Sequence, residues 1–199
     1  MSVRVRVVAI WLVVVSLPMV VSCSNLLGGH LGSSSTPPTA TTTSNASMTE
    51  RWTSDALTKA FAAINDKIGA NPADYVELLI TQYAVEIKAI NPQNRQNVDD
   101  YRYDGSNVKV APVDVSSNEP GVIEESAFKS DTVKPSILAT VMNSAAKDSG
   151  FQDVTVQSVT VKKWNADDPE PHLQAFVMGP RASKAVEYDL ATGQFQKVG

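Results

Sequence analysis

The same order of apolar and turn-forming segments occurs twice along this chain, and this repetition limits the folds that it can adopt. Each half opens with a helical pattern that ends at a glycine, and these glycines, Gly69 and Gly150, are 81 positions apart. Each half continues with extended segments and reaches a turn at Gly105 or Gly193. Because a helix with one apolar stripe must bury it against another layer, we expect an α+β fold of tandem αβββ repeats, with the helices packed on an antiparallel sheet. A chance similarity between two segments of one class is the alternative.

Both repeats begin with a predicted amphipathic helix. Thr53 or Ser54 can cap the first helix, and Gly69 suits its C-terminal end. Pro135 favours the start of the second helix, because a proline in the first turn loses no helical hydrogen bond, and Gly150 ends it. The apolar positions recur at helical spacing; they are Leu57, Ala60, Phe61, Ile64 and Ile68 in the first helix and Ile137, Leu138, Val141, Met142 and Ala145 in the second.

Extended segments follow each helix. Residues 83–89 alternate between apolar and polar side chains, which is the period of a half-buried strand. Residues 104–107 form a strong hairpin turn signal, and a slip in the alternation at Gln157-Ser158 predicts a β-bulge. The predicted strands cover residues 75–80, 82–90, 98–103 and 108–110 in the first half and 154–163, 173–178, 185–190 and 195–198 in the second.

The last hairpin carries a resemblance to known domains. It runs from Ala185 through Thr192-Gly193 to Phe195, and a strand with an acidic residue that leads into a Thr-Gly turn is similar to the ending of PepSY-like domains. The helix-then-strands order also resembles the PepSY-like and beta-lactamase-inhibitory-protein-like folds, whose units often occur in tandem. The resemblance implies an extracytoplasmic module for protein binding, peptidase inhibition or sensing, and it transfers no active-site residue.

The N-terminus has the pattern of a secretory signal. Arg4 and Arg6 precede an apolar run over residues 7–21, which is shorter than the roughly 20 residues of a membrane-spanning helix. Its end, Val20-Val21-Ser22-Cys23, resembles the lipobox of bacterial lipoproteins. That resemblance implies cleavage between Ser22 and Cys23 and a diacylglyceryl group on the Cys23 thiol, and two acyl chains anchor a protein stably. An ordinary secreted protein and an uncleaved anchor are the alternatives.

Cysteine count and charge narrow the possibilities for the processed protein. Cys23 is the only cysteine, so the chain cannot form an internal disulfide and must be stable through its core. Without Arg4 and Arg6, 15 of the 17 basic residues remain against 21 acidic residues, a net charge of about −6. This balance argues against nucleic acid as a partner and against broad electrostatic attachment to anionic lipid.

A Ser/Thr/Pro-rich stretch separates the cysteine from the globular part. It has too few apolar residues to offset the entropy of ordering, and its prolines favour an extended tether. A lipobox followed by such a linker resembles cell-envelope lipoproteins of mycobacteria and related actinobacteria, and the composition also suits O-glycosylation. The predicted division is a signal peptide over residues 1–22, the lipidated cysteine and tether over 23–50, one repeat over 51–115, a connector over 116–131 and the second repeat over 132–199.

The two histidines do not form a convincing site. His30 falls in the tether. His172 follows Asp167, Asp168 and Glu170, but zinc takes three or four protein ligands, and a solvated loop is the simpler interpretation of this acidic run. We predict no metal, no cofactor and no catalytic residue.

The remaining polar and aromatic motifs are also poor candidates for chemistry. Neighbouring carboxylates, such as Glu124-Glu125 and Asp99-Asp100, point to opposite faces when they lie on a strand. The basic and aromatic run Lys162-Lys163-Trp164 is too short for a nucleic-acid surface. Trp52 and Trp164 suit packing at an edge better than a ligand platform.

Two functions from different classes therefore remain. The first, which we favour, is a non-catalytic protein-interaction or sensing module, anchored by lipid on Cys23 to the outer face of the cell membrane and using one face of its sheet to hold an envelope protein. The second is a carrier of lipid or another small apolar ligand in the cell envelope. An apolar cavity of several hundred cubic ångströms would favour the carrier, whereas a filled core would favour the interaction module.

Overall fold

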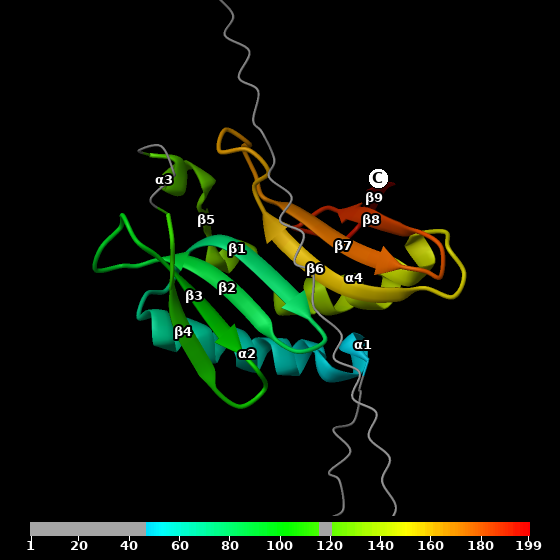
Figure 1. Cartoon of the computed structure of the whole chain (residues 1–199), viewed down its shortest axis with the longest axis horizontal. Helices are drawn as coiled ribbons and strands as arrows, with labels where there is room; N and C mark the ends of the chain where they lie inside the picture. The colour runs from blue at the N-terminus through cyan, green and yellow to red at the C-terminus, as the bar shows by residue number, and fades with distance from the viewer. Residues whose placement is uncertain (1–46, 116–120) are drawn as a thin grey trace, which may run out of the picture. The chain divides into compact units, whose positions relative to one another are not determined.

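A computed structural model describes residues 47–115 and 121–199, all within one compact unit (Figure 1). The predictions for Ser22, Cys23, His30 and most of the tether lie outside the described residues. Within those residues the chain forms one nine-stranded antiparallel sheet with helices packed against it. The α+β prediction is therefore confirmed.

Two long helices cover the same face of the sheet (Figure 1). Helix α2 (Ser54–Ile68) is capped by the Thr53 side chain, which accepts a hydrogen bond from the Ala56 N–H, and it ends at Gly69 in the left-handed conformation. Helix α4 (Pro135–Asp148) has its proline in the first turn, as predicted. The remaining helical segments are short: α1 (Met48–Arg51), α3 (Val122–Ser126) and the 3-10 turn η1 (Ser130–Thr132).

The sheet has the strand order β4-β3-β2-β1-β6-β7-β8-β9, and β5 pairs with one end of β1. Each half is therefore a four-stranded meander, and the halves join where β1 and β6 run antiparallel to each other. The strands are β1 (Asp74–Thr81), β2 (Val85–Ile90), β3 (Val98–Tyr103), β4 (Val108–Val113), β5 (Phe128–Lys129), β6 (Thr155–Lys162), β7 (His172–Met178), β8 (Ser183–Tyr188) and β9 (Phe195–Val198).

The two halves are related by an approximate twofold axis through the β1–β6 pair. Strand β6 starts and ends 81 positions after β1, at 155 and 162 against 74 and 81, and α4 starts 81 positions after α2, at 135 against 54. Leu79 and Thr160, which are also 81 apart, lie directly opposite each other in the ladder. The neighbouring pairs follow the same rule: Glu77 lies opposite Lys162, and their counterparts 81 positions away, Ser158 and Thr81, lie opposite each other. A rotation about an axis at Leu79 and Thr160 therefore exchanges the two strands.

The core lies between the sheet and the two long helices. Every predicted buried position of α2 is buried. In α4 the predicted positions are buried except Ile137, which is half-buried, and Ala139, which was not predicted, is buried as well. On the sheet the inward side chains alternate with outward ones, as in Val85 and Ile87 of β2, so one continuous apolar cluster joins both halves. The bulge predicted in β6 is present, since the β6–β7 register shifts between Val156 and Ser158.

Several boundaries differ from the sequence predictions. Strand β2 starts at Val85 because residues 82–84 form a turn, in which the Thr81 hydroxyl accepts hydrogen bonds from the N–H groups of Tyr83 and Ala84. Tyr83, which the alternation placed in the strand, is 63% exposed. The fourth strand of each half, predicted over residues 108–110 and 195–198, is present, so the repeating unit has four strands where the αβββ description counted three. Helix α1 begins at Met48, before the predicted end of the tether.

Candidate binding site

The β6–β7 loop holds the cluster of titratable residues that the sequence singled out. The Nε2 of His172 lies 3.5 Å from Oδ2 of Asp168. That carboxylate also accepts hydrogen bonds from the backbone N–H groups of Trp164, at 3.0 Å, and Asn165, at 2.9 Å. The backbone hydrogen bond from Asn165 is the main cause that lowers the Asp168 pKa. Asp168 thus stays ionised and closes the loop. Within the two described ranges, no three His, Cys, Asp or Glu side chains are grouped so that they could hold a metal ion.

A surface groove of about 690 Å³ opens beside this loop, within the size range of ligand pockets. Three stretches form its walls: the chain before α4, the β6–β7 loop, and the end of β8 with the turn that follows it. Its lining includes Thr132, Lys134, Glu170, His172, Tyr188 and Asp189. The sequence showed no signal for this groove, because the three stretches are far apart along the chain.

Carboxylates dominate the charge of this groove. Asp168, Glu170 and Asp189 line it, against Lys134 and the His172 that pairs with Asp168. The Asp189 carboxylate accepts hydrogen bonds from the hydroxyl and the N–H of Thr192, and these bonds lower its pKa. Glu170 is exposed on the rim. The groove is therefore suited to a cationic ligand group.

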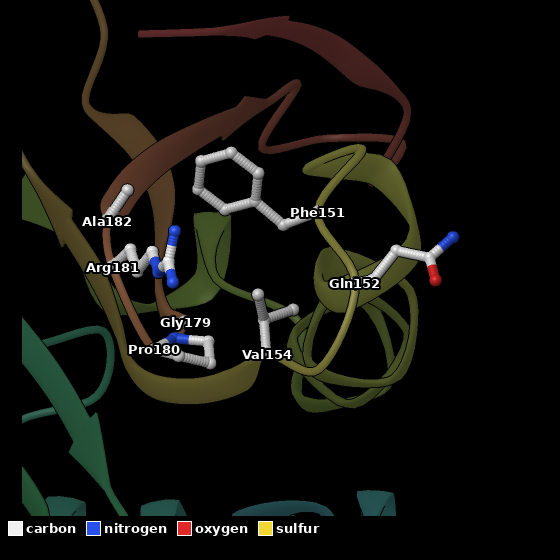
Figure 2. A pocket seen from close by; sticks show the side chains of 7 residues that line it. All are labelled: Phe151, Gln152, Val154, Gly179, Pro180, Arg181 and Ala182. Carbon is white, nitrogen blue, oxygen red and sulfur yellow. The ribbon is translucent and has the colours of Figure 1, made fainter.

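Two smaller recesses lie elsewhere on the surface. The first, of about 270 Å³, lies between the end of α4 and the β7–β8 turn. Figure 2 shows the Phe151 ring on one side of it and the turn with Pro180 and Arg181 on the other. The Nζ of Lys184 lies 4.1 Å from the centroid of the Phe151 ring. The second recess, of about 380 Å³, is lined by residues of α1, α4 and the start of β6.

The two tryptophans of the globular part occupy different environments. Trp164 is 43% exposed, with Lys162 Nζ 4.6 Å from its ring centroid, as expected for packing at an edge. Trp52 is instead part of the core and only 2% exposed. Its Nε1 donates a 2.6 Å hydrogen bond to the Thr81 carbonyl, so the expectation of edge packing was wrong for this residue.

The paired carboxylates of the sequence are not brought together into a site. Glu124 accepts a hydrogen bond from Arg95 Nε, at 2.8 Å, and the same guanidinium contacts Asp74 at 2.9 Å. Asp99 accepts from the Asn91 side-chain amide at 2.9 Å. Burial raises the Asp100 pKa, and its Oδ1 is buried without a hydrogen-bond partner in the part of the chain that the structure describes.

The sheet face opposite the long helices carries charges that pair across strands. Arg102 contacts Glu86, Lys88 lies 2.8 Å from Glu77, and in the other half Lys197 lies 3.3 Å from Glu187. Such pairs stabilise a sheet by tenths of a kcal/mol each. Since these charges already neutralise each other, this face offers a partner less unpaired charge than the groove does.

Comparisons with known proteins identify a fold but no family. No protein-family model and no curated protein sequence matches the chain. A solved structure from Clostridium difficile 630, described as a putative lipoprotein, superposes with a TM-score of 0.51 at 17% identity, over 72% of this chain and 91% of that one. At this identity the likeness concerns the fold alone. In the described residues, no helix combines the length and apolarity needed to cross a membrane.

Proposed function

We propose that this protein is a lipid-anchored, non-catalytic interaction module that holds another protein at the outer face of the cell membrane. The anchor rests on the lipobox-like run that ends at Ser22-Cys23. The description of the structural neighbour as a putative lipoprotein supports it. The sole cysteine is then used for the anchor, and the Ser/Thr/Pro-rich tether holds the globular part away from the bilayer.

One observation favours interaction over transport of an apolar ligand: the space between sheet and helices is filled. Leu57, Ile64, Leu78 and Leu138 are fully buried in one continuous cluster. The 690 Å³ groove lies at the edge of this cluster, which contributes Tyr188 to its lining, and charged side chains of surface loops line the rest. A carrier would instead need an apolar cavity where the core is packed. We therefore place the contact with the partner at the groove.

Replacement of Cys23 by Ala tests the anchor. The full-length protein should sediment with membranes and enter the detergent phase on phase separation, whereas the Cys23→Ala form should be released or retained as unprocessed precursor. Ser24→Ala, one position later, is the control and should behave like the parent. If the parent protein itself keeps residues 1–22, as its mass would show, and Cys23→Ala remains in the membrane to the same extent, residues 7–21 act as an uncleaved anchor and the lipoprotein proposal is wrong.

Native mass spectrometry tests the absence of a carried ligand. The protein is extracted from membranes, and its mass is compared before and after denaturation. We expect the same mass in both states beyond the covalent lipid. A bound lipid or other small molecule that leaves only on denaturation would favour the carrier instead.

A further inference from the structure

The groove beside the β6–β7 loop has a filled counterpart in the first half of the chain. The offset of 81 positions that relates β1 to β6 and the start of α2 to that of α4 carries Arg51 onto Thr132 and Trp52 onto Val133. Both pairs stand directly before the long helix of their half. The two places can therefore be compared side chain by side chain.

In the first half, Arg51 and Trp52 fill the space between two turns. Trp52 Nε1 donates to the Thr81 carbonyl at the end of β1, and its ring lies 6.3 Å from that of Tyr103, the last residue of β3. The Arg51 guanidinium lies 5.1 Å from the centroid of the Trp52 ring and donates a hydrogen bond to the Asp104 carbonyl. The cation and the aromatic ring thus form one stacked unit.

In the second half, the corresponding stretch borders the 690 Å³ groove. Thr132 lines the groove and is too short to reach across it as Arg51 does, whereas Val133 is buried in the core, as Trp52 is. The other walls correspond as well. Tyr188, the last residue of β8, pairs with Leu173 as Tyr103 pairs with Val85, and Asp189 follows it as Asp104 follows Tyr103. The Tyr188 hydroxyl donates to Asp148 of α4, whereas the Tyr103 ring lies beside Trp52. The β6–β7 loop, longer than the β1–β2 turn, adds Asp168 and Glu170 to the rim.

We infer that this groove binds an arginine with a neighbouring aromatic residue, presented by an extended or turn segment of the partner protein. The first half shows that this fold accommodates such a pair between these two turns. The acidic rim of the groove complements the added guanidinium, which carboxylates bind through charge-assisted hydrogen bonds. Because this chain's own Arg51 and Trp52 are engaged in the first half, the pair comes from another protein. This inference rests on the proposed interaction function and names the chemistry that the partner presents.

A peptide with the sequence of residues 47–54, which contains the Arg51-Trp52 pair, is the probe. It is titrated into isotope-labelled protein that spans residues 23–199 and carries Cys23→Ser, and amide shifts are followed by NMR. We expect saturable shifts at His172, Tyr188, Leu190 and Ala191. A peptide in which the arginine is replaced by alanine should bind about tenfold more weakly, as for the loss of a charge-assisted contact. Replacement of the tryptophan by alanine should weaken binding by about the same factor, through the loss of apolar and cation–π contact.

Two variants with matched controls locate the binding. Glu170→Lys reverses a rim charge, and Ala191→Trp places a bulky side chain in the groove; each should weaken binding about tenfold or more. Each control makes the same kind of change at an exposed position away from the groove: Asp66→Lys on α2 reverses a charge, and Ala111→Trp on β4 adds a bulky side chain. Both controls should leave binding unchanged. Parent-like spectra of all four variants show that the fold is intact.

Several outcomes would overturn the inference. Equal binding of the alanine peptides, shifts centred on Thr81 and Asp104 instead of the groove, or unchanged affinity in both groove variants would each do so. Failure here is distinguishable from failure of the proposed function. If the groove does not bind the peptide while Cys23→Ala still releases the protein and no ligand is carried, the interaction module stands and its contact lies elsewhere.

Discussion

Trp52 and Thr81 are joined by a 2.6 Å hydrogen bond from the indole Nε1 to the backbone carbonyl, across 29 positions of sequence. The bond ties the chain that enters α2 to the turn that ends β1. Trp52 is at the same time one of the largest fully buried side chains of the core. The entry of the chain into the domain is therefore part of the core and not an appendage of the tether.

Trp52→Phe should lower the free energy of unfolding by about 1–3 kcal/mol, since the Thr81 carbonyl loses its donor and the smaller ring leaves part of the buried space unfilled. Urea unfolding followed by circular dichroism measures the difference. Trp164→Phe is the control, because Trp164 is 43% exposed, and it should change stability by less than about 0.5 kcal/mol. Equal effects of both variants would contradict the assigned role of Trp52.

Asp74 gives the protein part of its acid sensitivity. Burial raises the Asp74 pKa, but hydrogen bonds from Lys129 and Arg95 outweigh this effect, so the net pKa is lowered. Since the folded-state pKa is below the unfolded one, the stabilisation is fully present above the ordinary aspartate pKa of about 3.9 and is lost as the pH falls through the lower folded value. Asp74→Asn should therefore lower stability at pH 7 and flatten its decline below about pH 4. Asp66→Asn, at an exposed helical position, should leave the slope of the curve unchanged.

Tyr188 should make the stability of the protein depend on pH in the alkaline range. Burial is the largest cause that raises its pKa to about 12, and its hydroxyl lies 3.0 Å from Asp148 Oδ2. Because the folded-state pKa is above the ordinary value of about 10, stability should fall as the pH rises from about 10 towards 12. Tyr188→Phe should reduce this alkaline loss, measured by urea unfolding at pH 9 to 12. The control Tyr83→Phe, at a position 63% exposed, should not.

Gly193→Ala should destabilise the protein more than Gly150→Ala. Both glycines have φ of +70°, where an alanine costs about 1–2 kcal/mol. At Gly150 an added Cβ would meet no atom within 4 Å, but at Gly193 it would lie 3.1 Å from Cγ2 of Ile137 on α4. Thermal unfolding of the two variants gives the difference directly. Equal melting temperatures would show that the β8–β9 turn moves away from α4 without cost.

Local sequence signals were sufficient wherever the determining contacts are short in range. The Thr53 cap, the glycine after α2, the proline at the start of α4 and the bulge in β6 each depend on neighbouring residues along the chain, and each is present. Alternation failed at Tyr83, because the Thr81 hydroxyl accepts hydrogen bonds from the N–H groups of Tyr83 and Ala84 and makes a turn more favourable than an extended chain.

The sequence by itself determined the class of fold, the two halves, and the lipobox-like pattern at Cys23, since these depend on residue spacing and local conformational preference. Only the tertiary structure decided that β1 and β6 join the halves into one sheet, that Trp52 is buried, and that Thr132 borders an open groove whereas its counterpart Arg51 contacts Asp104. Each of these depends on which distant side chains meet across the sheet. Spacing along a single chain does not specify such non-local contacts, because they arise only when the packed layers form.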